Sequence, residues 1–139
     1  PDAAADAAPE ATAAAHVAAY TASAELVAAA FAAADPAGAA WLPEISTARP
    51  FPVPLARSFH LIDYVAHSWD VARTLGTTVA FDDDVLAEAV RVAELVPDDE
   101  SRTGERAFFR PRLPVPDDAV PLDRFLLLLG RDPAWAPPA

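Results

Sequence analysis

Cysteine, methionine, lysine, asparagine and glutamine are all absent from this chain of 139 residues. Without cysteine there is no disulfide framework, no thiol nucleophile and no cysteine-ligated zinc site. Glycine is also scarce, and the four that are present form no glycine-rich loop of the kind that binds phosphate groups. The chain begins at Pro1 instead of methionine, so we expect either N-terminal processing or a fragment of a longer protein.

Positive charge is scarce as well. Lysine and arginine together number 10 against 21 acidic residues, which gives a net charge of −11 and an isoelectric point near 4.4. Proteins that bind nucleic acids need basic side chains to replace the counterions of the phosphate backbone, and anionic membrane surfaces attract basic segments. The composition therefore predicts no nucleic-acid partner and no membrane partner, and the acidic excess favours solubility.

Long apolar runs are missing too. No continuous apolar run reaches about 18 residues, which predicts no transmembrane helix. The N-terminus has no basic segment followed by an apolar one, so it does not read as a secretory signal. We therefore expect a cytoplasmic protein.

What the chain does have is 53% hydrophobic residues, many of them alanine. Alanine buries little area, so the core must depend on a few large side chains. The length is typical of a single domain over residues 1–139. The residues expected to build its core are Trp41, Phe59, Ile62, Tyr64, Trp69 and Phe125.

Apolar periodicity, prolines and glycines predict four helices and no strand of useful length, so the fold class is all-α. Residues 1–10 are expected to be a flexible linker or a frayed helix start. A short extended piece is possible near residues 41–45. Residues 97–120 form a proline-broken loop that Phe108, Phe109 and Leu113 are expected to anchor. The helices are predicted at residues 11–34, 54–75, 82–96 and 121–129, the last capped by Asp117 or Asp118.

One predicted helix carries the candidate site. His60, Asp63, His67 and Asp70 are spaced by three, four and three residues, which places them on one helical face. Imidazole and carboxylate groups on one face suit a divalent-metal site or acid–base chemistry. A helix usually supplies two ligands four residues apart, as Asp63 and His67 are, and His60 is a further candidate one turn earlier.

The same pattern also arises in a pair of surface histidines with carboxylate partners, and this alternative stays open. Asp70 is a candidate for hydrogen bonding to a ligand histidine. It is equally able to pair with Arg73 or Arg57. The third histidine, His16, is expected to be exposed on the alanine-rich first helix, although it would approach the site if that helix packed against residues 54–75.

The segment Asp63-Tyr-Val-Ala-His67-Ser-Trp69-Asp70-Val-Ala-Arg73 resembles a known signature. It is similar to the carboxylate-x-x-x-His-x-Trp-Asp-hydrophobic-Ala-Arg segment of DinB-type four-helix-bundle proteins, in the branch of mycothiol-dependent maleylpyruvate isomerases. Residues 114–135 are similar to the tail of that branch. The resemblance implies a divalent metal, with zinc the expected ion, held by Asp63, His67 and a histidine on an earlier helix. It also implies a low-molecular-weight thiol, mycothiol, as cosubstrate of a metal-dependent isomerase or transferase.

The chain departs from the family pattern in two ways. Asp63 is one methylene shorter than the usual glutamate, and the Gly-His-Leu segment that should carry the third ligand is absent, as are two helices expected before residue 11. We therefore expect a partial DinB-like helical bundle with long proline-rich loops and a short C-terminal helix. A homodimer or a missing N-terminal segment would complete it, and His60 would serve as the third ligand. The alternative is a non-catalytic or degenerate structural or interaction module of the same fold.

Overall fold

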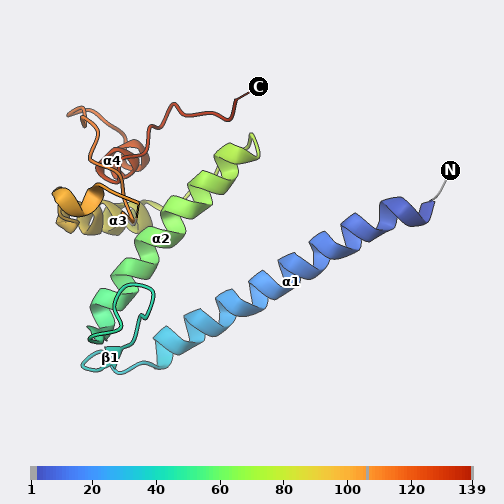
Figure 1. The fold of residues 1–139 in the computed structure, drawn as a ribbon, viewed down its shortest axis with the longest axis horizontal. Coiled ribbons are helices and arrows are strands. Elements are labelled where there is room, and N and C mark those ends of the chain that lie inside the picture. The colour runs from blue at the N-terminus through green and yellow to red at the C-terminus, as the bar shows by residue number, and fades with distance from the viewer. Residues whose placement is uncertain (1–2, 106, 139) are drawn as a thin grey trace. The chain divides into compact units, whose positions relative to one another are not determined.

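The structure, a computed structural model, describes residues 3–105 and 107–138 and is mostly helical (Figure 1). This confirms the all-α class. A short antiparallel pair of strands joins the first two helices, and a 3₁₀ turn, η1, follows the third. The elements are α1 (Ala3–Ala33), β1 (Ala39–Ala40), β2 (Phe51–Pro52), α2 (Val53–Thr74), α3 (Asp83–Leu95), η1 (Glu100–Arg102) and α4 (Pro121–Leu128).

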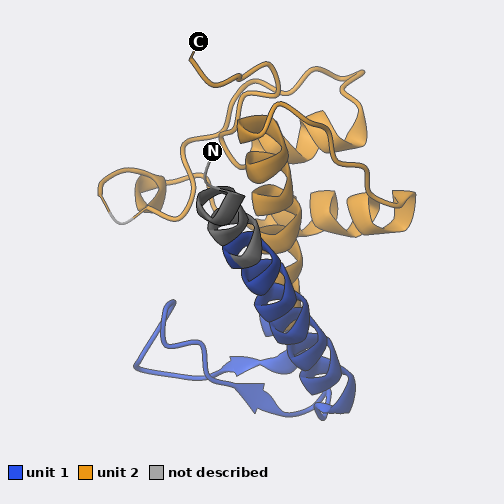
Figure 2. Ribbon diagram, turned by 90° about the vertical axis from the view of Figure 1, so that its right-hand side faces the viewer, with its two compact units in different colours: residues 1–56 blue, residues 57–139 orange. Residues whose placement is uncertain are grey.

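The chain divides into two compact units, Pro1–Ala56 and Arg57–Ala139, which Figure 2 shows in different colours. The first, unit 1, contains α1, the strand pair and the start of α2. The second, unit 2, contains the rest of α2 with α3, η1 and α4. The single domain expected over residues 1–139 stays a prediction.

In unit 1, α1 is a long helix that depends on alanine, the residue with the highest helix propensity. It begins at Ala3, before the predicted start at residue 11, and ends at Ala33, ahead of the predicted stop at Asp35 and Pro36. Its large apolar side chains are mostly exposed: Val17 by 66%, Tyr20 by 61% and Leu26 by 72%. Intrinsic propensity therefore stabilises much of α1.

Part of α1 meets the length and composition of a membrane-spanning helix. The segment Thr12–Ala33 has 22 residues and a mean hydropathy of 1.2, and none of its apolar window is buried in the structure. The sequence analysis predicts no such helix. Signal sequences and core helices of soluble proteins have the same length and composition. The finding thus leaves the expected cytoplasmic location and the expected absence of a membrane partner as predictions.

The strand pair joins Ala39 to Pro52 and Ala40 to Phe51, and the amide of Val53 donates to the carbonyl of Gly38. Phe51 and Val53 are buried beside it. The short extended piece predicted near residues 41–45 lies just before them, at β1, whereas the amides of residues 45 and 46 both donate to the carbonyl of residue 42 in a turn. Trp41, predicted in the core, is 60% exposed.

In unit 2, one core is formed by apolar side chains of α2, α3 and α4. Ile62, Trp69 and Phe125 are buried as predicted, while Phe59 and Tyr64 are half-buried. The small residues Ala66, Ala89 and Ala93 lie in the same core, where short side chains let helix backbones approach closely. The buried residues of the cluster are Ile62, Val65, Ala66, Trp69, Ala89, Val92, Ala93, Phe125, Leu126, Leu128 and Leu129.

The helix boundaries in unit 2 follow the sequence signals. Gly76 and Gly130 have positive φ angles of 67° and 75°. Each follows its helix in a Schellman motif, with paired bonds from the amides of Gly76 and Thr77 and of Gly130 and Arg131 back into the last turn. At the start of α4, however, the N-cap is Val120 instead of Asp117 or Asp118.

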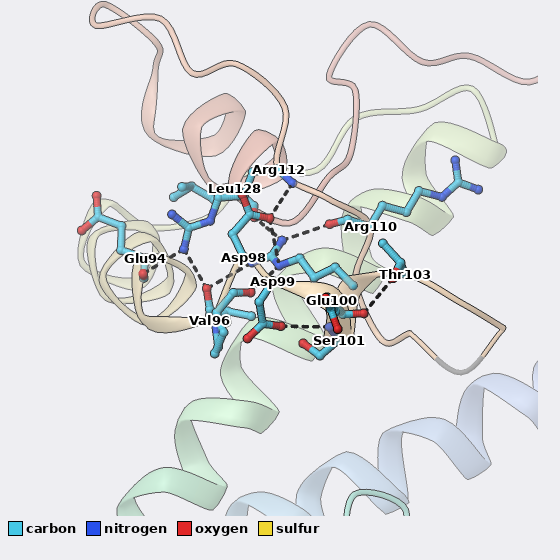
Figure 3. Close-up of polar contacts among 12 residues, drawn as sticks. Glu94, Val96, Asp98, Asp99, Glu100, Ser101, Thr103, Arg110, Arg112 and Leu128 are labelled. Atoms are coloured by element: carbon cyan, nitrogen blue, oxygen red, sulfur yellow. Dashed lines mark hydrogen bonds and ion pairs between the residues drawn. The ribbon is translucent and has the colours of Figure 1, made fainter.

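Arg102 organises the long loop after α3 by hydrogen bonds to Val96, Arg110 and Leu128, which Figure 3 labels. Its side chain is only 2% exposed and donates hydrogen bonds to backbone carbonyls. Nη1 donates to Leu128 at 2.8 Å and to Arg110 at 3.0 Å, Nη2 donates to Val96 at 3.2 Å, and Nε donates to Pro97. One guanidinium thus satisfies carbonyls at the C-terminal ends of both α3 and α4.

Arg112 contributes a second set of bonds to the end of α3. Its Nη2 donates to the carbonyls of Glu94 at 3.0 Å and Val96 at 2.7 Å (Figure 3). The prediction that Phe108 anchors this loop is wrong, because that side chain is 68% exposed. Arginine donors that converge on helix ends hold the loop instead, together with the half-buried Phe109 and Leu113.

Candidate metal centre

The candidate site lies on α2, on the part of the helix that belongs to unit 2. Ile62, Val65, Ala66 and Trp69 bury the neighbouring face of this helix in the core. That packing fixes the α2 backbone and leaves the polar face accessible, with the side chains of Asp63 and His67 61% and 62% exposed. The site is therefore open to solvent on a rigid support.

The ring of His67 lies between two carboxylates. Nε2 is 3.2 Å from Oδ1 of Asp63, and Nδ1 is 3.0 Å from Oδ2 of Asp70. The predicted helical face therefore does bring Asp63, His67 and Asp70 together. The contact of Asp70 with His67 agrees with the prediction that Asp70 hydrogen-bonds to a candidate ligand histidine.

Asp70 is held from its other side by Arg131, from the segment that follows α4. Nε and Nη2 of Arg131 donate to the two oxygens of Asp70, each at 2.9 Å. Burial favours a raised pKa for Asp70, but the hydrogen bond and charge of Arg131, together with His67, outweigh it and hold the pKa below its ordinary value. Asp70 is therefore an ionised acceptor for the His67 ring.

Arg131 is the partner of Asp70, in place of the Arg73 or Arg57 predicted from the sequence. Arg73 instead donates through Nε and Nη2 to the carbonyl of Trp135. Arg131 lies 61 residues from Asp70 along the chain, so no local spacing rule finds this pair. The only signal was that both residues fall in the two segments with a family resemblance.

His60 and His16 lie apart from this arrangement. The ring of His60 is half-buried against Tyr64, with ring centroids 4.5 Å apart. His16 is exposed on α1 in unit 1. Across residues 3–105 and 107–138, no group of three or more histidine, aspartate or glutamate side chains is placed to hold a metal ion. His60 as a third ligand therefore stays a prediction.

The two remaining donors fit zinc in geometry. A tetrahedral zinc ion with bonds of about 2.0–2.1 Å separates two ligand atoms by about 3.3 Å. The observed separation of Nε2 of His67 and Oδ1 of Asp63 is 3.2 Å. Asp70 lies at the opposite nitrogen, so it cannot share the same ion and instead takes the place of an outer partner that orients the ring.

The charges of the site agree with this fit. A neutral imidazole carries one ring proton, and if Nδ1 donates it to Asp70, the lone pair of Nε2 faces the Asp63 carboxylate. A lone pair and a carboxylate oxygen at 3.2 Å repel each other unless a positive charge lies between them. That charge is either a second ring proton, which makes an ordinary surface ion pair, or a metal ion.

No family model matches the chain, and neither the curated proteins nor the solved structures contain a match.

Proposed function

We propose that this chain is a divalent-metal-binding helical domain of the DinB-like kind, with zinc the expected ion and with Asp63 and His67 as two of its ligands. The observation that carries the proposal is the 3.2 Å separation of Nε2 and Oδ1 on a ring whose other nitrogen is already engaged by Asp70. Neutral imidazole and carboxylate are ligands that zinc accepts.

The third protein ligand comes from His60 or from a histidine of a second copy or a further segment. Zinc held by two protein ligands leaves more positions to solvent than the three-ligand sites of catalytic zinc proteins. When bound, the ion would lower the pKa of a coordinated water or thiol, so that the deprotonated nucleophile is available near neutral pH. The family resemblance adds a low-molecular-weight thiol, mycothiol, and an isomerase or transferase activity to the proposal. Asp63 and His67 hold the ion, and Asp70 orients His67.

Zinc binding by equilibrium dialysis tests the metal proposal. We expect saturable binding to the wild type, and a loss of at least tenfold in affinity in His67→Gln and Asp63→Asn, because each variant removes one of the proposed ligands. His16→Gln is the matched control, since it removes an exposed histidine from unit 1 and should bind zinc as the wild type does. Wild-type protein that binds no zinc, or a His16→Gln loss equal to that of His67→Gln, would overturn the proposal.

His60→Gln tests the third ligand separately. A loss in zinc affinity comparable to that of His67→Gln assigns His60 to the site. Unchanged affinity assigns the third position to another donor, and sedimentation with and without zinc then shows whether a second copy supplies it. A zinc-dependent dimer is the expected result in that case.

A second candidate function is a non-catalytic structural module. The pairing of Asp70 with Arg131 favours it, because this bond joins α2 to the segment after α4 without any metal. Two results together would support the structural module and exclude the metal site: the wild type binds no zinc, and Asp70→Asn has a lower thermal stability than the wild type.

A further inference from the structure

The backbone of the segment after α4 is held in place by the end of that helix. Arg131 follows Gly130 in the Schellman motif, and its amide donates to the carbonyl of Leu126 at 2.8 Å. Gly130 combines a φ of +75° with a close approach, since a Cβ built there would lie 2.6 Å from the carbonyl oxygen of Arg110. The backbone of Arg131 therefore has a defined position at the end of α4.

The guanidinium of Arg131 leaves Asp70 a single orientation. Both carboxylate oxygens accept from the planar fork of the guanidinium, and the Arg131 side chain is only 20% exposed. A bidentate pair of this kind fixes geometry as well as charge. Since Oδ2 of Asp70 also contacts Nδ1 of His67, the orientation of Asp70 is passed to the imidazole ring.

A second link holds the same segment against α2. Arg73 donates through Nε to the carbonyl of Trp135 at 2.9 Å, and its guanidinium lies over the Trp69 ring. Within the segment, the amides of Ala134 and Trp135 donate to the side chain and the carbonyl of Asp132. Residues 131–135 are thus attached to α2 at two points.

We propose that Arg131 is a positioning residue, which acts through Asp70 to hold the proton of His67 on Nδ1 and to present the lone pair of Nε2 toward Asp63. An ionised carboxylate only accepts, and two carboxylates compete for the ring proton. Asp70 is the closer, at 3.0 Å against 3.2 Å for Asp63, and it is the one held by Arg131, so the geometry favours a proton on Nδ1. The ring proton and ring orientation of a ligand histidine are commonly set by such a partner. The expected effect of Arg131 on zinc affinity rests on the proposed function, whereas its effect on the tautomer of His67 does not depend on any metal.

Nitrogen-15 NMR of histidine-labelled, metal-free protein tests the tautomer. At about pH 9, well above the ordinary pKa of histidine, we expect His67 to carry its proton mainly on Nδ1 in the wild type. Arg131→Gln should shift the population toward Nε2. Arg131→Lys should fall between the two, because lysine keeps the charge but not the planar fork.

Controls and a second variant keep this test decisive. Arg124→Gln removes an arginine of α4 that pairs with Glu94 instead of Asp70, and should leave the His67 signals unchanged. Asp70→Asn should repeat the effect of Arg131→Gln without altering Arg131 itself. A wild-type tautomer that survives both Arg131→Gln and Asp70→Asn in folded protein would overturn the proposal, as would an equal shift in Arg124→Gln.

Zinc affinity of the same variants separates the inference from the proposed function. We expect Arg131→Gln to bind zinc about tenfold more weakly than the wild type. If the wild type binds no zinc, the proposed function fails, and the tautomer measurement alone decides the role of Arg131. If Arg131→Gln changes the tautomer but binds zinc with wild-type affinity, the positioning role toward the metal is wrong.

Discussion

The longest helix of this protein, α1, and the shortest, α4, depend on different sources of stability. α1 has 31 residues, and its large side chains Val17, Tyr20 and Leu26 are exposed. α4 has eight residues, of which Phe125, Leu126 and Leu128 are buried. Alanine propensity stabilises much of α1, whereas α4 depends on apolar burial, because packing of one face supplies most helical stability in proteins.

The same difference bears on where the proposed metal site lies. His16 lies exposed on α1. His67 lies between two carboxylates at 3.2 and 3.0 Å, on a helix whose neighbouring face is packed in a core. A functional side chain needs a backbone and neighbours that hold it in place. His67 in unit 2 has these supports, and this is why we place the proposed metal site there.

Hydrogen exchange should show the largest contrast. Amides of α1 between residues 12 and 33 are expected to exchange through local opening, since few side chains there are buried. Amides of Phe125 and Leu126 should exchange only on global unfolding, with an opening free energy about 5 kcal/mol higher. Mass spectrometry of exchanged peptides measures this. Equal protection of α1 and α4 would show that α1 is packed.

Truncating one aromatic ring in each unit should give the next largest effect. Phe125→Ala removes a side chain with no exposed surface and should cost about 3–5 kcal/mol in the free energy of unfolding. Tyr20→Ala removes an aromatic that is 61% exposed and should change it by less than about 0.5 kcal/mol. Urea unfolding measures both. Similar costs for the two variants would contradict the contrast between the units.

Within unit 2, the buried arginine should matter more than an exposed one. Arg102→Met leaves the carbonyls at the ends of α3 and α4 without their donor and should cost about 2–3 kcal/mol. Arg91→Met, the matched control, removes an exposed pair with Glu88 and should leave the unfolding midpoint unchanged. Thermal unfolding tests both. A stable Arg102→Met protein would show that other groups hold the loop.

The smallest expected effect depends on pH. Hydrogen bonds from the side chain and the amide of Ser101 lower the pKa of Asp99 below its ordinary value of 3.8. Its contribution to stability is therefore fully present above that value and is lost as the pH falls through the lower pKa of the folded protein. Asp99→Asn should be slightly destabilised at pH 7 and equal to the wild type in strong acid.

Thermal unfolding across this pH range checks the prediction for Asp99. Asp118→Asn, an exposed carboxylate elsewhere in the same loop, serves as the control. A difference between Asp99→Asn and the wild type that persists or grows in acid would give the opposite sign and contradict the account.

Local signals predicted much of the fold. The helix ends predicted at residues 75 and 129 and the start predicted at residue 82 each lie one residue from the observed bounds of α2, α4 and α3, because helix boundaries depend on backbone conformation within a few residues. The exposure of Trp41 and Phe108 was missed, since hydrophobicity alone does not tell which large side chains the packed elements can cover.

Only those contacts of the candidate site that join residues close in sequence could be predicted. Asp63, His67 and Asp70 share a helical face, and that spacing fixed their contacts. The pairing of Asp70 with Arg131 and the burial of Arg102 depend on which helix ends meet, and tertiary packing sets that. An arginine in a charged loop reads as a solvated residue, although free carbonyls at two helix ends can bury it.

In the proposed site, Asp63 and His67 on α2 bind a divalent metal while the histidine of unit 1 does not. Nitrogen-15 NMR of the three histidines during a zinc titration tests it most directly, because each ring gives its own signals. The account predicts that the Nε2 signal of His67 shifts and saturates with zinc while the signals of His16 stay unchanged. A His67 signal that does not move in excess zinc, or that moves in proportion to that of His16, would contradict it.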